Sequence, residues 1–199
     1  MFGIEEAIVK YVEQIERLPT LMGRTAANTT IYNGNTMFAT VLHNLKGPRN
    51  VGQIIRSHVA YGGGPLLFVG HDEPWTFRKS TSRYSRNLEQ HRDIVHIPND
   101  DAFFDWCIEN DYTPIAIEIA NPPLFLANFS FPTRPAIIVG HEGQGLPKEL
   151  LARCAHVITI PQQGPVASLN IPVACSTVMY EFRRSDFDTP HIESAKYPE

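Results

Sequence analysis

The stretch RPAIIVGHEGQGLPKELLARCAHVITIP, residues 134–161, indicates the fold class. It begins with a predicted strand over 134–140, whose apolar run AIIV is typical of a strand buried on both faces. A helical pattern follows over 146–154, and a second strand-like run covers 155–161. A strand, a helix and a strand in this order favour an α/β unit with parallel strands.

The same alternation extends to both sides of this stretch. The pattern predicts further strands and helices at 37–45, 50–62, 65–70, 93–97, 100–111, 112–120 and 168–184. The sequence therefore predicts an α/β domain with a mostly parallel sheet and helices on both faces. Outside this domain we expect an amphipathic helix over 3–18 with a polar linker up to 36, and a polar tail over 185–199.

Composition and charge exclude several classes of protein. Hydrophobic residues make up 43% of the 199 residues and charged residues 19%, which suits a globular chain and not a disordered one. The 17 basic and 21 acidic residues give a formal charge of −4, so a strongly basic nucleic-acid binder is excluded, although a local basic patch is not. No apolar run is long enough for a membrane span, and the N-terminus does not resemble a secretory signal.

The cysteines and histidines suggest neither a disulfide framework nor a metal site. Three cysteines without close pairs, Cys107, Cys154 and Cys175, favour a reducing compartment, and we expect a cytoplasmic protein. Neither a CxxC nor an HExxH motif occurs. We therefore expect no metal.

Three segments that follow predicted strands hold the unusual residues: NVGQIIRS at 50–57, IIVGHEGQGLP at 137–147 and IPQQGPVASLN at 160–170. Each also has a purely structural interpretation. Asn50 and Ser168 suit helix caps, Arg56 suits a surface cation, and the glycines suit a tight turn. The glycine loop is neither a dinucleotide fingerprint nor a Walker loop, because its spacing is GxxGxG and no GK[ST] follows.

Taken together and in this order, the three segments resemble the motifs of the SpoU/TrmH branch of the SPOUT methyltransferases. The resemblance covers residues 37–184, which we take as the methyltransferase domain. It departs from the usual pattern at His141, where the family has Asn, and at Pro172, where a small residue is more usual. The resemblance implies methyl transfer from S-adenosylmethionine to a ribose 2′-hydroxyl of tRNA or rRNA. It also implies a C-terminal trefoil knot that binds the cofactor, and a homodimer with the active site at its interface.

The resemblance assigns roles to individual residues. It places in catalysis or orientation Arg56, Asn50, Ser168, Asn170 and Glu142. It places at the cofactor Gly140, Gly143, Gly145, Ile160, Gln162, Gly164 and Leu169. Arg56 resembles the arginine named as proton acceptor in this branch, but arginine is a poor base. An orienting cation that stabilises developing alkoxide charge is the alternative role.

Basic residues near these motifs are candidates for RNA contact, because RNA affinity needs cations against phosphate. They are Lys46, Arg49, Arg78, Lys79, Arg83 and Arg86. In the segment 73–92 the aromatic residues Trp75, Phe77 and Tyr84 alternate with the cations and suit base stacking. The alternative for this segment is a solvated loop with aromatic core anchors. For the whole protein, the alternatives are a non-catalytic RNA- or cofactor-binding member and a base-methylating SPOUT enzyme.

Overall fold

The computed structural model describes residues 37–71, 75–91 and 93–186, and the expected helix over 3–18 and most of the expected tail lie outside these ranges. The strands are β1 Ala39–His43, β2 Leu66–Val69, β3 Ile94–Ile97, β4 Thr113–Ile117, β5 Leu124–Phe125, β6 Pro135–Val139 and β7 His156–Thr159. The α-helices are α2 Pro48–Ala60, α3 Lys79–Ser85, α4 Asp100–Glu109, α5 Lys148–Arg153 and α6 Ile171–Arg183. Short 3₁₀ turns occupy Leu88–His91, Leu126–Asn128 and Arg184–Asp186.

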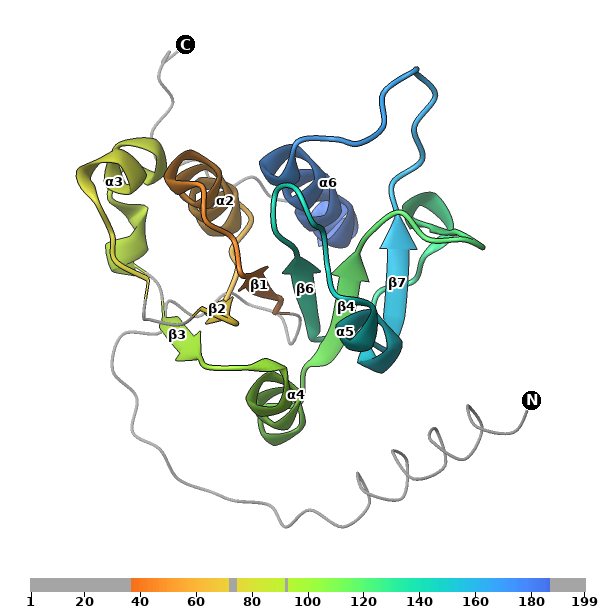
Figure 1. Ribbon diagram of the computed structural model, residues 1–199, viewed down its shortest axis with the longest axis horizontal. Helices are drawn as coiled ribbons and strands as arrows, with labels where there is room; N and C mark the ends of the chain where they lie inside the picture. The colour runs from red at the N-terminus through yellow and green to blue at the C-terminus, as the bar shows by residue number, and fades with distance from the viewer. Residues whose placement is uncertain (1–36, 72–74, 92, 187–199) are drawn as a thin grey trace. The chain divides into compact units, whose positions relative to one another are not determined.

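The described strands form one seven-stranded sheet in the order β3-β2-β1-β6-β4-β7-β5 (Figure 1). Every pair of neighbouring strands runs parallel, so the predicted α/β class with a parallel sheet is confirmed. Strand β6 lies between β1 and β4, and Val41 of β1 is in register with Leu67 on one side and Ile138 on the other. In such a sheet the carboxyl ends of all strands meet at one edge.

Helices cover both faces of the sheet, as predicted (Figure 1). Alternate strand residues point to opposite faces, so each strand contributes to two separate cores. One core joins Leu42, Phe68 and Ile137 to α2 and α6. The other joins Val41, Leu67 and Ile138 to α4 and α5. The strands read as unbroken apolar runs because both of their faces are buried.

Three local predictions need correction. The helix expected from Asn50 begins at Pro48, with Gly47 at its N-cap, so Asn50 does not cap it. The last helix begins at Ile171, not at Ser168, because Pro172 fits only its first turn. The segment after Trp75 is not a solvated loop: it forms α3, which packs against α2. Its lack of a long apolar stripe hid this helix in the sequence.

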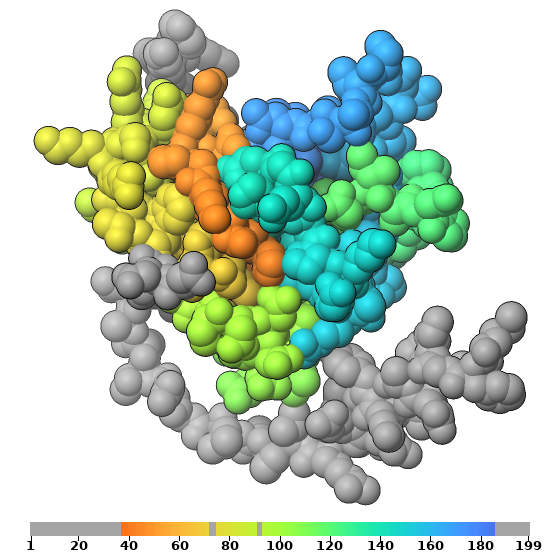
Figure 2. All heavy atoms as spheres, in the orientation of Figure 1, coloured from red at the N-terminus to blue at the C-terminus, as the bar shows by residue number. Residues whose placement is uncertain are grey.

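Loops from distant parts of the chain meet at the carboxyl edge of the sheet. The loop after β6 lies between the chain that leads into α2 and the loop that follows β7, and the space-filling view shows these segments in teal, orange and blue (Figure 2). These are the three segments that the sequence singled out. The fold therefore brings them to one place, as expected for a parallel sheet.

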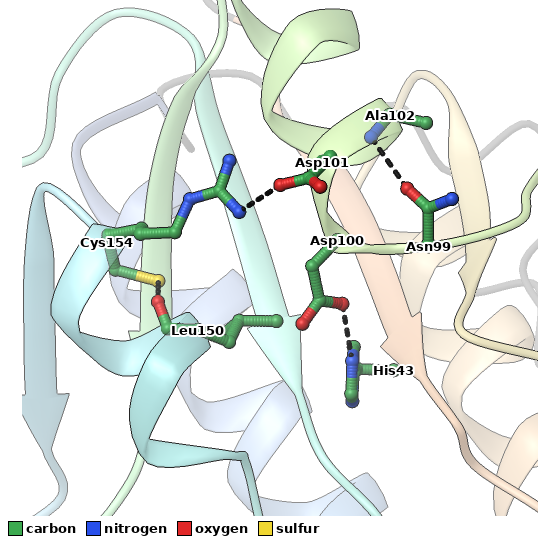
Figure 3. A network of polar contacts seen from close by, with 8 residues as sticks. His43, Asn99, Asp100, Asp101, Ala102, Leu150 and Cys154 are labelled. Atoms are coloured by element: carbon green, nitrogen blue, oxygen red, sulfur yellow. Dashed lines mark hydrogen bonds and ion pairs between the residues drawn. The ribbon is translucent and has the colours of Figure 1, made fainter.

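Polar contacts anchor α4 to the neighbouring elements (Figure 3). The His43 side chain at the end of β1 donates from Nε2 to Asp100 Oδ1 at 2.9 Å. Asn99 caps the helix by accepting from the Ala102 N–H, and Arg153 of α5 contacts Asp101 at 2.6 Å. The pair of Arg153 and Asp101 is solvent-exposed and contributes little, so the cap and the buried His43 contact matter more here.

Candidate active site

Glu142 joins two segments that lie more than 90 residues apart in the sequence. Its Oε1 accepts hydrogen bonds from the Gly47 N–H at 2.8 Å and from Asn50 Nδ2 at 3.1 Å. Its Oε2 accepts a longer bond from the Lys46 N–H at 3.4 Å. The first motif is therefore held to the second by one carboxylate. Asn50, a predicted catalytic residue, uses its side chain to donate to Glu142.

These hydrogen bonds keep Glu142 charged. Partial burial alone would raise the pKa of its carboxyl group. The hydrogen bonds from its own backbone N–H, from Gly47, from Asn50 and from Lys46 outweigh burial, and the net pKa lies below the ordinary value of 4.5. The group is a carboxylate at neutral pH. It is suited to hold backbone donors in place and unsuited to act as a general acid.

The glycine loop after β6 folds back on itself. His141 and Gly145 exchange two backbone hydrogen bonds, of 3.2 and 2.9 Å. Gly145 has a φ of +67°, and a Cβ on Gly140 would lie 2.5 Å from the Gly145 carbonyl atoms. Both positions therefore require glycine. Gly143, in contrast, has no close neighbour at its Cβ position.

A cavity of about 490 Å³ opens between the loops that follow β4, β6 and β7. Of the predicted cofactor and catalytic residues, it is lined by Gly140, Gly143, Gly145, Ile160, Gln162, Leu169, Glu142 and Ser168. Gly164 and Asn170 are not among its lining residues. Gly164 is exposed with open space around it, and Asn170 sits at the N-cap of α6 without a side-chain capping bond.

The cavity also contains residues that the sequence did not single out. Glu118 and Ile119, directly after β4, line it together with Lys148 at the start of α5. For Glu118 and Ile119 the only available signal in the sequence was their place after a predicted strand, which many loop residues share.

Gln162, a predicted cofactor residue, lines the same cavity, and its Oε1 is buried without a hydrogen-bond partner among the described residues.

A second, wider groove of about 740 Å³ lies between α2, α3 and α6. It is lined by Arg56, Arg83 and Arg86, and by Tyr61, Tyr84 and Tyr180. Helix α6 contributes to both sites, with Ile171 and Ala174 lining the cavity and Val173 and Tyr180 the groove. The structure thus gathers three predicted cations in one groove but places Arg56 apart from Glu142 and Ser168.

The remaining predicted RNA contacts are exposed side chains that do not line the groove. Lys46 and Arg49 flank the start of α2, and the Arg49 guanidinium lies 5.8 Å from the centre of the Tyr84 ring. Arg78 and Lys79 begin α3. Of the three aromatic residues near these cations, only Tyr84 is exposed and suited to stacking.

Trp75 and Phe77 instead anchor the chain to the core. Both pack against the buried Phe68 ring, with ring centroids 5.4 and 5.9 Å apart. For these two residues the alternative of core anchors is therefore confirmed, while base stacking by them stays a prediction. Trp75 stacks face to face on Phe68, whereas Phe77 meets it in a T-shaped contact.

Residues 37–71, 75–91 and 93–186 contain no cluster of three or more His, Cys, Asp or Glu side chains placed to hold a metal ion. Within the same ranges no helix has the length and apolar character needed to cross a bilayer.

Comparison with known proteins identifies the family. The SpoU rRNA Methylase family matches residues 37–180. A protein of Staphylococcus aureus assigned to the TrmH family of tRNA/rRNA methyltransferases is 29% identical over 152 residues, which are 76% of this chain and 60% of that protein. A Staphylococcus haemolyticus protein of the same assignment is 28% identical over 144 residues, or 72% of this chain and 57% of its own. The chain thus spans about 60% of the length of these relatives.

Solved structures agree with this assignment. An rRNA methyltransferase of Sinorhizobium meliloti, crystallised with AdoMet, superposes with a TM-score of 0.69 at 25% identity, over 78% of this chain and 59% of that one. A chain studied for 2-OH methylation of C/U34 on tRNA superposes with a TM-score of 0.68 at 27% identity, over 78% of this chain and 100% of that one.

The parallel sheet, the glycine-loop cavity and the family match agree with one another. The chain belongs to the SpoU rRNA methylase family, and the resemblance read from its three motifs is confirmed.

Proposed function

We propose that this protein transfers a methyl group from S-adenosylmethionine to a ribose 2′-hydroxyl of tRNA or rRNA. The observation that carries the proposal is the meeting of the three motif segments at one edge of the sheet, around a cavity built from glycine backbone. The AdoMet-bound S. meliloti relative and the chain studied for 2-OH methylation support the cofactor and the reaction type.

The cavity suits S-adenosylmethionine. Its apolar walls and bare glycine backbone fit a flat purine, because main-chain groups can approach a ligand closely where no Cβ intervenes. The unpaired Gln162 Oε1 offers an acceptor for an amino group such as that of adenine. Lys148 supplies a cation suited to the methionine carboxylate. When bound, the cofactor supplies a methyl group activated on a sulfonium.

Methyl transfer requires little from the protein beyond alignment of the ribose hydroxyl with the methyl group. The ribose oxygen forms a bond to the methyl carbon, the carbon–sulfur bond breaks, and the hydroxyl proton leaves to water or to a neighbouring base. Alignment of the hydroxyl with the methyl group is worth several kcal/mol. Arg56 orients the target and stabilises the developing alkoxide, because a guanidinium is a strong paired donor and a poor base.

We propose further that the protein is a homodimer and that Arg56 of the partner subunit faces the cofactor cavity. The groove that holds Arg56 is separated from the cavity by α6 within one chain. On the groove side of this helix Val173 and Tyr180 are 52% and 46% exposed, which suits an interface. A concentration-independent monomer mass by light scattering in an active preparation would contradict the dimer.

Two other parts of the proposal rest on family likeness and local chemistry. The C-terminal segment is proposed to form the trefoil knot of the SPOUT fold. The exposed cations of the groove and of α3, together with Tyr84, are proposed to contact RNA phosphates and an unstacked base.

The direct test is to incubate the protein with methyl-labelled S-adenosylmethionine and bulk tRNA or rRNA. The RNA is then digested to nucleosides and analysed by mass spectrometry. We expect the label in a 2′-O-methylated nucleoside. Label in a base would favour the base-methylating alternative, and cofactor binding without any transfer would favour the non-catalytic one.

A further inference from the structure

Glu118 directly follows β4 and makes hydrogen bonds both to the end of β7 and to the loop after β6. Its backbone N–H donates to the Ile158 carbonyl at 3.1 Å, and its carbonyl accepts from Thr159 Oγ1 at 2.8 Å, so β7 fixes the residue on both sides. The buried Thr159 hydroxyl also accepts from the Ala120 N–H at 3.1 Å. The main chain at Glu118 is therefore held rigidly at the end of β4.

The Glu118 side chain reaches into the cavity and across to the glycine loop. Its Oε2 accepts from the Leu146 N–H at 3.2 Å and lies 2.6 Å from the place where a Cβ on Gly145 would stand. Its Oε1 accepts from the Ile119 N–H at 3.0 Å. Glycine at 145 leaves the space that this carboxylate fills.

The carboxylate keeps unused hydrogen-bonding capacity. A carboxylate has about four acceptor positions, and two of these take the backbone donors just described. Among residues 37–71, 75–91 and 93–186, no cation forms an ion pair with Glu118. Glu142, the other carboxylate that lines the cavity, already receives donors from the first motif. Of these two carboxylates, Glu118 is thus the one that keeps acceptor positions open to a ligand.

We propose that Glu118 binds the 2′- and 3′-hydroxyls of the cofactor ribose, an inference that rests on the proposed function. A ribose diol supplies two O–H donors, which match the two open acceptor positions, and carboxylates bind nucleotide riboses in this way in other α/β folds. The apolar neighbours Ile117, Ile119 and Ile160 line the same cavity and suit the adjoining purine. Glu118 would therefore select the adenosine part of the cofactor and brace the glycine loop against it.

The test measures affinities by calorimetry, with no need for turnover. The ligands are S-adenosylmethionine, S-adenosylhomocysteine and the 2′-deoxy and 3′-deoxy forms of the latter. The proteins are wild type, Glu118→Ala, Glu118→Gln and the control Glu149→Ala, which removes an exposed carboxylate of α5 that does not line the cavity. Wild type should bind S-adenosylhomocysteine about ten- to a hundredfold more tightly than the deoxy forms.

In Glu118→Ala this preference should largely vanish, and affinity for the intact ribose should fall to that for the deoxy forms. Glu118→Gln keeps one acceptor oxygen and should lie between the two, so it decides the question if Glu118→Ala folds poorly. Glu149→Ala should behave as wild type.

Three outcomes overturn the inference. An equal loss for all ligands in Glu118→Ala would mean that the residue only braces the loop. A loss confined to S-adenosylmethionine would mean that the carboxylate faces the sulfonium charge. Equal affinity of the wild type for S-adenosylhomocysteine and its deoxy forms would exclude diol binding altogether. If wild type binds none of the ligands, the proposed function itself fails, which is a separate and recognisable result.

Discussion

The cavity and the groove are built in opposite ways. Main-chain groups and glycines at the sheet edge form much of the cavity, whereas exposed arginine and tyrosine side chains of three helices form the groove. At Gly140 and Gly145, which line the cavity, there is no room for a side chain. A ligand in the groove meets charged and aromatic groups on solvent-facing helices. Substitutions that add atoms should therefore damage the cavity, and substitutions that remove atoms should damage the groove.

The largest effect is expected from removing Arg56, the groove cation that is proposed to orient the target hydroxyl. Arg56→Ala should lower the rate of methyl transfer by about 10²–10³-fold, because a transition-state donor is lost. Cofactor affinity should stay nearly unchanged, since Arg56 does not line the cavity of its own chain and is proposed to act on the target hydroxyl. Arg56→Lys separates the two proposed roles: it should restore much of the rate if charge alone matters, and fail if the forked donor geometry matters. Unchanged turnover in Arg56→Ala would show that the wrong residue was assigned.

Adding one carbon to the cavity should produce the next largest effect. Gly140→Ala places a Cβ 2.5 Å from the Gly145 carbonyl group, so the loop must shift. Cofactor affinity, measured by calorimetry, should fall roughly tenfold or more, in line with about 1–3 kcal/mol of overpacking. Gly164→Ala is the matched control, because nothing lies within 4 Å of its Cβ position, and it should bind as wild type. Equal losses in both variants would argue against a rigid backbone-built site.

Glu142 should make the link between the first two motifs sensitive to pH. Its folded-state pKa lies below the ordinary value of 4.5, so its hydrogen bonds stabilise the fold above that value, and this contribution is lost as the pH falls through the folded-state pKa. Glu142→Gln should reduce the free energy of unfolding at pH 7 by about 1 kcal/mol and flatten its decline in acid. Denaturant unfolding at pH 7 and pH 4 measures both effects. An equally steep acid decline in the variant would contradict this role.

The smallest effects are expected from the outer cations of the groove. Arg83→Ala or Arg86→Ala should weaken RNA binding by about two- to fivefold and lower the salt slope by about one unit each. Arg153→Ala is the control, because Arg153 belongs to α5, on the opposite face of the sheet. Filter binding over a series of salt concentrations gives both quantities. Slopes unchanged in the groove variants would exclude these arginines from RNA contact.

Much of this arrangement could be predicted from the sequence. Runs such as AIIV and LLFV are apolar throughout because both sheet faces are covered, and this pattern predicted parallel strands at β6 and β2. The glycines of the loop after β6 marked the cavity, and at Gly140 and Gly145 only glycine fits the close contacts. The resemblance in the three motifs then led to the family.

Other features of the site and the fold could not be predicted, because they depend on contacts between residues that lie far apart in the sequence. Glu118 resembles any loop acid until the fold places it against Gly145 and Leu146. A helix cap was the structural alternative for Asn50, but a carboxylate 92 residues away receives its side-chain donor instead. Helix α3 was not predicted because its buried residues are the polar Thr81 and Ser85, so its buried face shows no apolar periodicity.

Subunit complementation is the most direct test, since in the proposed dimer the groove of one subunit lies against the cavity of the other. An Arg56→Ala chain and a Gly140→Val chain are each expected to be inactive as homodimers. Co-expression creates heterodimers in which one site pairs an intact cavity with an intact Arg56. Methyl transfer should then recover to about a quarter of the wild-type rate, as random assembly of dimers predicts. A mixture as inactive as its two parents, with heterodimers confirmed by mass spectrometry, would contradict the account.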